Sequence, residues 1–462
     1  MLPLPEEEKP DEVSGSAVQS WVLAMVRAAL EDLELAEREA AAACAVPRWF
    51  NQDLLLALMG DRLAPSGAER ILEQMRGWEF VRSLGQGRYM FRDTARAAIL
   101  AELAPAASLA LLHARAQAYF DRQLGEVVLD ESAWMRLRPE QFNLLREKVY
   151  HMLRRDARQG YDVFRQLFRG AHAWYLPGEA EALMHTLQGM DLAALPQSAR
   201  DELAFFEAVQ DAADYRYETA EARLNALLEQ SQPPVDPTLR ARVQGELGKL
   251  LAVTGRLNEA AVLFGQAQAA FQRLGGMRES AAIANNMGSV YLNLRDFRAA
   301  RAAFQQALDG LRQYGSEGDQ AQAYNNLGTA WEREEEWSRA LEHYQTSLAL
   351  KEQIGDSFGA ARTRANIGSV YHAQIRDVDD ARRAARLRDS ALALYEQSLA
   401  TFQQFGARTE AARVQFKQAL LYYQSGQVQQ ARAALPDVLE EYRALRIPGV
   451  EHVENLAALL EG

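Results

Sequence analysis

Asparagine side chains recur at a fixed spacing in the middle of the chain, and they could bind a peptide backbone. The pair Asn285–Asn286 is followed by the pair Asn325–Asn326, and Asn366 follows Asn326 at the same interval. One asparagine amide offers both donors and an acceptor, so it can satisfy the N–H and the C=O of an extended peptide. The same amides could instead bond to neighbouring helices and stabilise their stacking. The sequence leaves both alternatives open.

Hydroxyl and basic side chains accompany the asparagines. Ser289 and Thr329 each come three residues after an asparagine, at helical spacing. The chain repeats with a period of 40 residues, and charged residues also occupy the positions that are expected to face the same way as the asparagines. They are the basic Arg242, Lys249, Arg333, Arg362, Arg413 and Lys417 and the acidic Glu246 and Glu332. The whole chain carries a net charge of −12, with 51 Lys plus Arg against 63 Asp plus Glu. A basic strip on an acidic protein favours an acidic ligand or a free carboxylate.

The sequence contains no arrangement typical of catalysis or of metal binding. The seven histidines are scattered, and none forms an H-E-x-x-H motif. Cys44 lies in an alanine-rich segment, where a small buried thiol is expected. The glycine–lysine pair Gly248–Lys249 is followed by Leu250, so it does not form a G-x-x-x-x-G-K-[ST] phosphate loop. We therefore expect no enzymatic activity, no cofactor and no metal.

An internal repeat of 40 residues must position the asparagines and the basic side chains. Glycine recurs at Gly248, Gly288, Gly328 and Gly368, alanine follows at Ala260, Ala300 and Ala340, and an aromatic residue follows at Phe264, Phe304 and Tyr344. This pattern predicts pairs of antiparallel helices, with a turn near the seventh residue after each glycine and a second glycine, such as Gly275, Gly315 or Gly355, as a left-handed C-cap. Small residues let the helices approach, and the aromatic rings fill the gaps. An insertion near 376–390 shifts the later units.

This order of Leu-Gly, aromatic, Ala and Phe resembles the tetratricopeptide repeat over residues 201–446. The chain departs from the family in its period, which is 40 rather than about 34 residues, and it lacks the closing proline. The resemblance implies an all-α, right-handed superhelix whose concave groove is lined by the first helix of each pair and binds peptides or proteins. Placed in that groove, the candidate peptide-binding residues are Asn285, Asn286, Ser289, Asn325, Asn326, Thr329, Arg333, Arg362, Asn366, Arg413 and Lys417.

Residues 19–110 carry no repeat and predict three helices followed by a β-hairpin. Asn51 is a suitable N-cap and Gly60 a suitable stop for the second helix. In "EFVRSLGQGRYMFRD", two apolar segments flank a glycine-containing turn, as in a hairpin. Three helices and a two-stranded wing describe a winged-helix-like domain. Its candidate recognition helix, "SGAERILEQMRGW", balances two arginines with two glutamates, which favours packing over DNA binding but leaves DNA binding open as an alternative.

A winged helix before tetratricopeptide repeats resembles the C-terminal half of bacterial STAND-type signalling ATPases. The segments that carry this resemblance are "AVPRWFNQDLLLALMG" and "GRYMFRDTARAAILAEL". Because no phosphate loop is present, the resemblance implies the winged-helix and sensor part without its motor. The hypotheses are thus a non-enzymatic scaffold or sensor for a peptide or protein, a transcription regulator whose winged helix reads DNA, and the sensor half of a STAND-type ATPase.

The remaining segments complete the expected organisation. We expect a disordered acidic tail over 1–18, helical connector hairpins over 111–200 and a capping helix over 447–462. Hydrophobic residues make up 48% and charged residues 25% of the chain, as in a folded soluble protein. One cysteine and no recognisable signal peptide or membrane span suit the cytoplasm. The oligomeric state cannot be predicted.

Overall fold

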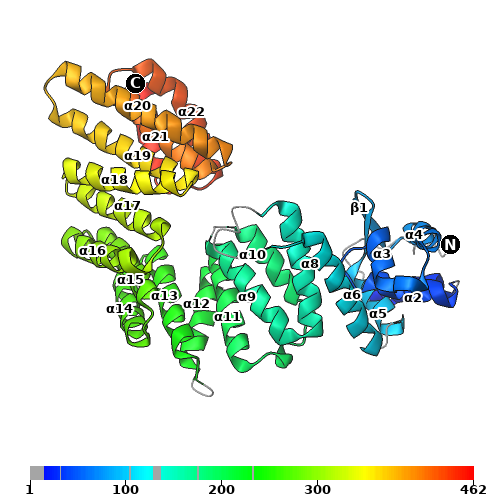
Figure 1. The fold of residues 1–462 in the computed structure, drawn as a ribbon. Coiled ribbons are helices and arrows are strands. Elements are labelled where there is room, and N and C mark those ends of the chain that lie inside the picture. The colour runs from blue at the N-terminus through cyan, green and yellow to red at the C-terminus, as the bar shows by residue number, and fades with distance from the viewer. Residues whose placement is uncertain are drawn as a thin grey trace. The chain divides into compact units, whose positions relative to one another are not determined.

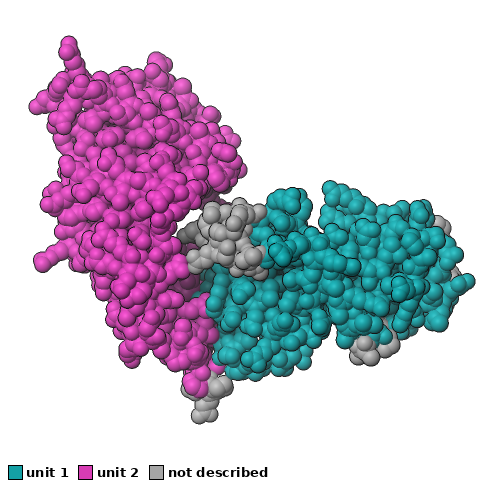
Figure 2. Space-filling model, in the orientation of Figure 1, with its two compact units in different colours: residues 1–214 teal, residues 215–462 magenta. Residues whose placement is uncertain are grey.

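The computed structural model describes residues 15–31, 33–103, 106–127, 137–173, 176–230 and 234–461. Of the tail expected over 1–18, residues 1–14 lie outside this described part. The chain divides into two units, residues 1–214 and residues 215–462 (Figure 2). Helices dominate both units, and the described strands form one two-stranded sheet (Figure 1). The predicted all-α fold with a small hairpin is confirmed.

The first part of unit 1 contains five helices and the hairpin. Their bounds are α1 Gly15–Glu31, α2 Leu35–Ala45, α3 Gln52–Met59, α4 Pro65–Arg76, β1 Val81–Gly85, β2 Arg88–Phe91 and α5 Asp93–Leu103, with a 3-10 turn, η1, at Gly60–Arg62. Asn51 caps α3 as predicted, because its side chain accepts a hydrogen bond from the Leu54 N–H at 2.9 Å. Gly60 ends the helix with a φ of 61°. The elements therefore follow the order of a winged helix, although kinship with that family remains a prediction.

The hairpin pairs Val81 with Phe91 and Arg82 with Met90 in antiparallel register. Gln86 and Gly87 turn the chain with φ of 50° and 71°, a left-handed conformation that glycine adopts without steric cost. Phe50 bridges to Tyr89 through two backbone hydrogen bonds of 2.8 Å. Phe91 is buried in a core that also includes Phe120 of α6, the helix Ala106–Leu124. This core therefore contains residues on both sides of position 110.

The rest of unit 1 is helical. Its helices are α6 Ala106–Leu124, α8 Pro139–Arg155, α9 Ala157–Ala173, α10 Pro177–Met184 and α11 Gln197–Ala213, with 3-10 turns η2 His185–Leu187 and η3 Leu192–Ala194. Helix α8 packs against both α6 and α9. That residues 111–200 act as connector hairpins stays a prediction.

Unit 2 is an array of helix pairs with a closing helix. After α12 Tyr217–Glu229, the pairs are α13 Pro237–Val253 with α14 Leu257–Leu274, α15 Met277–Asn293 with α16 Phe297–Tyr314, α17 Glu317–Arg333 with α18 Trp337–Gln353, α19 Ser357–Gln374 with α20 Ala381–Gln404, and α21 Arg408–Gln424 with α22 Val428–Ala444. Helix α23, Val450–Glu461, packs against α22. Within the array, each second helix packs against the first helix of the next pair (Figure 1).

The recurring glycines create space for the recurring aromatic rings. A Cβ added at Gly288 would lie 2.5 Å from Phe304, and one added at Gly328 would lie 2.6 Å from Tyr344. Both aromatic side chains are fully buried. The aromatic ring of the second helix therefore occupies the volume that any larger residue in the first helix would need.

The turns also follow the predicted positions. The residue seven places after the repeat glycine has positive φ at Gly255, Arg295 and Glu335, with values of 86°, 61° and 60°. The second glycine is left-handed at Gly275, Gly355 and Gly406. Gly315 is an exception, with a φ of −99°, because Ser316 begins α17 directly with a capping box. The prediction of a left-handed cap is therefore wrong at Gly315.

The insertion near 376–390 lengthens one second helix. It covers most of the 3-10 turn η4 Ile375–Asp377 and the first part of α20, which has 24 residues where α18 has 17. The Trp337 Nε1–H donates to Asp377 Oδ2 at 3.0 Å and thereby holds the start of the insertion against α18.

Candidate functional site

First helices of neighbouring pairs contact one another from α13 through α21. We call the polar side shared by four of these helices, α15, α17, α19 and α21, the first-helix face. Its residues are Asn285, Asn286, Ser289, Gln322, Asn326, Thr329, Glu332, Arg333, Arg362, Asn366, Ser369, Arg413 and Lys417. The alternation of buried and accessible residues along each helix turns these side chains away from the core and leaves them half-buried or exposed.

A chain of hydrogen bonds crosses three first helices. The Arg362 guanidinium of α19 donates to Gln322 Oε1 of α17 at 2.8 Å, and Gln322 Nε2 donates to Asn326 Oδ1 at 2.9 Å. Asn326 Nδ2 then donates to Asn285 Oδ1 of α15 at 2.9 Å. Three predicted residues are thus brought together, and Gln322 is a link that sequence reasoning missed.

A second network lies deeper, between α17, α18 and α19. Asn366 Nδ2 and the Thr363 hydroxyl both lie 3.2 Å from Asn325 Oδ1. Lys351 Nζ donates to Thr363 Oγ1 at 2.9 Å and has an exposed fraction of only 2%. Burial, followed by the nearby charge of Arg362, lowers the pKa of Lys351 to about 8. Asn325 is itself buried, so its amide belongs to the helix interface.

A third cluster lies toward α21. Lys417 Nζ donates to Ser369 Oγ at 2.8 Å, and the Tyr344 hydroxyl donates to Glu332 Oε2 at 2.5 Å. Burial raises the pKa of Glu332, while the hydrogen bond from Tyr344 and the charge of Lys417 oppose that shift. Burial also lowers the pKa of Lys417, against the attraction of Glu332. One partly buried carboxylate therefore lies among several cations.

The remaining predicted residues are more accessible. Arg333 and Arg413 are exposed, and their charges act on Lys417. Asn286 is half-buried, and Ser289 is exposed, with its hydroxyl bonded to the Asn285 carbonyl of its own helix at 3.4 Å. Four of the asparagines, namely Asn285, Asn325, Asn326 and Asn366, form hydrogen bonds between helices, as the stacking alternative requires. The amide of Asn286 makes no hydrogen bond within the described part of the chain.

Comparison between repeats could have identified the missed residues. Lys351 occupies the position that the buried Leu311 holds in the preceding repeat, and Thr363 occupies the position of the buried Ala323. A polar residue at a position that is apolar in the preceding repeat indicates a buried polar network. Gln322 gives no comparable signal, because glutamine is ordinary on a half-exposed helix face.

The described residues also bear on metal binding and on membrane insertion. No cluster of three or more metal-binding side chains occurs among the residues that the structure describes. In the same residues, no helix combines the length and the apolar character needed to cross a membrane. Burial raises the pKa of the Cys44 thiol.

The stacked helix pairs, with the first-helix face along one side, define an all-α helical-repeat protein. The family model for the tetratricopeptide repeat matches residues 239–313, so the chain contains tetratricopeptide repeats. The match supports a protein-interaction or sensor role in general. A search of curated proteins found no match.

The chain is similar to several solved structures at low sequence identity, and one of them, with a TM-score of 0.57, shows the same fold. A STAND protein with a tetratricopeptide repeat sensor from Pyrococcus horikoshii is 11% identical and has a TM-score of 0.57, covering 98% of this chain. The present chain spans 63% of that protein. The quorum sensor NprR from B. thuringiensis is 14% identical over 65% of this chain and 78% of its own, with a TM-score of 0.46. A Rap protein in complex with Competence and Sporulation Factor is 13% identical over 76% of this chain and 95% of its own, with a TM-score of 0.44.

Proposed function

We propose that the chain is a non-enzymatic sensor or scaffold that binds an extended, acidic peptide or protein segment on the first-helix face. The observation that carries this proposal is the charge of the face. Among the residues that define the face, Arg333, Arg362, Arg413 and Lys417 outnumber the one acidic residue, Glu332, although the whole chain has a net charge of −12. Asp319 and Glu410 lie one helical turn before Gln322 and Arg413, and Asp319 pairs with Arg278. Such a local field favours an anionic partner and speeds its encounter with the protein.

The amides of the face retain capacity for a ligand. An asparagine amide has two N–H donors and two acceptor sites on its oxygen, and each of the contacts between helices described above uses one of these. Asn326 and Asn366 are half-buried, so their remaining donors can reach a bound main chain. The donor and acceptor sites of the Asn286 amide are all unused within the described residues, so they can all serve a ligand. In this arrangement one set of amides both stabilises the stack and binds peptide, which combines the two alternatives.

A peptide array tests the proposal. Short random peptides of acidic, neutral and basic composition are immobilised and incubated with the purified chain. The proposal predicts preferential binding to the acidic set, and it predicts that Arg333→Glu/Arg413→Glu weakens that binding at least about tenfold, or ~1.4 kcal/mol. The matched control is Arg298→Glu/Arg383→Glu, which makes the same charge change on the second helices α16 and α20. Equal binding to all three sets, or equal loss in both variants, would refute the proposal.

A second candidate is the sensor half of a STAND-type ATPase. It is favoured by the structural match that covers 98% of this chain and 63% of the Pyrococcus protein. Under this proposal the motor domain is supplied by another chain or by a longer form of this protein. Sequencing the coding region around the gene tests it, since a fused or adjacent nucleotide-binding domain carries a recognisable phosphate loop.

A further inference from the structure

Four arginine side chains gather around one buried tyrosine in unit 1. Arg154 lies over the Tyr150 ring, with its guanidinium carbon 3.6 Å from the ring centre. The guanidinium carbons of Arg48 and Arg96 lie 5.2 and 5.4 Å from the same centre. Arg146 precedes Tyr150 by four residues in α8, as Arg154 follows it by four, so these side chains share one face of the helix. We call the four arginines, all of them half-buried, the arginine cluster.

Three of these arginines are held in place by the fold. Arg96, from α5, donates to the last carbonyl of α2 and to the next carbonyl along the chain, each at 2.7 Å. Arg154 donates to one carbonyl within the 3-10 turn η2 and to the carbonyl directly after that turn, at 3.1 and 2.6 Å. Arg48 forms an ion pair of 2.8 Å with Glu147 of α8. Each guanidinium keeps at least one nitrogen without a hydrogen bond in the described part of the chain, so its remaining donors are already oriented for a ligand.

The fourth arginine, Arg146, has no partner among the described residues. Its Nε is a buried atom that makes no hydrogen bond there, and its guanidinium forms no ion pair there either. Buried donors in folded proteins are nearly always paired, because leaving one unpaired costs free energy. Arg146 can therefore offer all five of its N–H donors to an acceptor that does not belong to the described residues.

The cluster carries more positive than negative charge. Two described carboxylates act on it, namely Glu147, which is 2% exposed and paired with Arg48, and Glu179, whose charge acts on Arg146. Four cations against two anions leave an excess of two positive charges among these six residues. Burial lowers the pKa of Arg154 to about 10, and burial followed by the charge of Arg48 lowers the pKa of Arg146. A bound anion would offset both the burial and the repulsion between the guanidinium groups.

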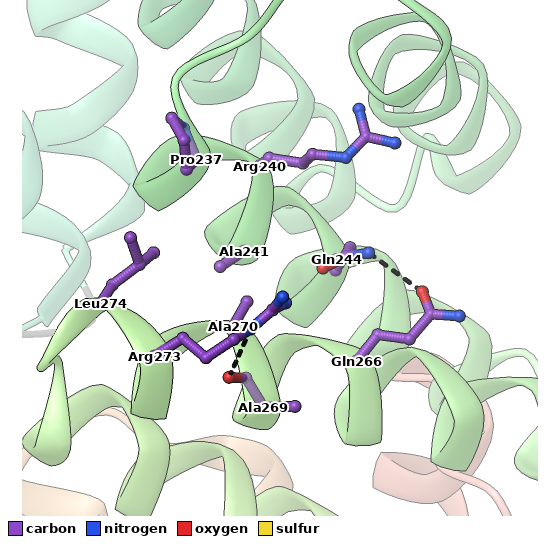
Figure 3. A pocket seen from close by; sticks show the side chains of 9 residues that line it. All are labelled: Pro237, Arg240, Ala241, Gln244, Gln266, Ala269, Ala270, Arg273 and Leu274. Carbon is purple, nitrogen blue, oxygen red and sulfur yellow. Dashed lines mark hydrogen bonds between the residues drawn. The ribbon is translucent and has the colours of Figure 1, made fainter.

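The groove on α13 and α14 in unit 2 provides a comparison (Figure 3). Its two arginines, Arg240 and Arg273, are exposed and donate to backbone carbonyls at 2.7 and 3.3 Å. Within the described residues, neither contributes a buried nitrogen without a partner, and no aromatic ring lines the groove. These two arginines therefore serve as a control for non-specific attraction of anions.

We propose that the arginine cluster binds the phosphate group of a small anionic ligand. The planar fork of a guanidinium matches the spacing of phosphate oxygens, and one phosphate group accepts hydrogen bonds from several donors at once. A phosphate monoester carries a charge of about −1.5 to −2 at pH 7, which matches the excess of positive charge in the cluster. Arg146 supplies the donors that no described residue uses, and the other three arginines add theirs. The cluster lies in unit 1 and the first-helix face in unit 2, so the inference does not depend on the proposed function.

Isothermal titration calorimetry of the purified full chain with pyrophosphate tests the inference, with chloride added to keep the ionic strength constant. We expect binding that Arg146→Gln weakens at least about tenfold, whereas Arg146→Lys keeps the charge and should weaken it less. Glu147→Gln removes a buried carboxylate and should tighten the binding at least about threefold. Inorganic phosphate and glycerol 3-phosphate then distinguish the source of the phosphate group. An ester that binds as tightly as the free ion indicates a phosphorylated small molecule, weaker binding indicates the free ion, and both results support the site.

Two control variants keep the result specific. Arg273→Gln removes one exposed arginine of the groove in Figure 3, and Arg333→Glu/Arg413→Glu alters the first-helix face. Each should leave pyrophosphate binding within about twofold. Thermal unfolding without ligand shows that each variant folds, and Glu147→Gln tests the site independently if Arg146→Gln does not fold. The inference is overturned if pyrophosphate does not bind, if Arg273→Gln weakens binding as much as Arg146→Gln, if only the first-helix variant weakens it, or if Arg146→Gln and Glu147→Gln both leave it unchanged.

Discussion

Gly288 of α15 packs so closely against Phe304 of α16 that a Cβ added to the glycine would lie 2.5 Å from Cδ1 and Cε1 of the ring. Glycine costs about 1 kcal/mol relative to alanine inside a helix. That local cost is offset by burial of a phenylalanine side chain, a contribution of about 1.5–3 kcal/mol. The same relationship holds for Gly328 and Tyr344. Close packing of helices, not ligand binding, therefore explains the repeated glycine.

Replacing that glycine should destabilise the array. In Gly288→Ala the added methyl overlaps the buried ring, and such overpacking costs about 1–3 kcal/mol, which more than cancels the gain in helix propensity. The control is Gly265→Ala in α14, where a Cβ would meet nothing within 4 Å. That change should stabilise the protein by up to about 1 kcal/mol. Urea denaturation monitored by circular dichroism measures the free energy of unfolding of both variants. A Gly288→Ala variant that is as stable as the wild type would contradict the packing explanation.

The buried amine of Lys351 should make stability depend on pH. Its pKa is lowered to about 8 in the folded protein, from a value of 10.5, so between these limits the unfolded chain binds more protons than the folded one. Stability should therefore rise from pH 8 to about 10.5, and the charged amine should destabilise the fold below pH 8. Replacing it with leucine, the residue at position 311, removes this dependence.

Denaturation of the wild type and of Lys351→Leu at several pH values checks this expectation. The variant should be more stable at pH 7, because an apolar side chain replaces a buried charge whose hydrogen bonds go to the uncharged oxygens of Gly359 and Thr363. The difference between the two proteins should shrink as the pH rises through 8. A difference that stays constant up to pH 10 would show that Lys351 does not titrate in this range.

Several of these features could be predicted from the sequence, and others could not. The repeat period located the helix pairs, their turns and the glycine–aromatic contacts, because each repeat imposes the same local sterics at the same position. It did not reveal the Lys351–Thr363–Asn325 network, since that depends on which side chains meet between two particular repeats. The conformation at Gly315 was likewise missed, because the following serine cap changes how α16 ends.

The asparagines should differ in their effect on stability. The Asn326 amide donates to Asn285 of the neighbouring first helix and accepts from Gln322 of its own helix. Asn326→Ala removes both hydrogen bonds and leaves half-buried partners, at a cost of about 0.5–1.5 kcal/mol for each bond. Asn286 makes no such bond within the described residues, so Asn286→Ala should change stability by less than about 0.5 kcal/mol. Thermal unfolding of the two variants distinguishes them. Equal losses would show that Asn286 also belongs to the helix interface.

Hydrogen exchange on a bound peptide complex tests the central claim most directly. The purified chain is measured by mass spectrometry with and without the tightest acidic peptide from the array. The account predicts slower exchange in segments of α17, α19 and α21 around Arg333, Arg362 and Lys417, and no such change in the Arg333→Glu/Arg413→Glu variant. Protection confined to other parts of the chain, with these three helices unaffected by a peptide that binds, would contradict it.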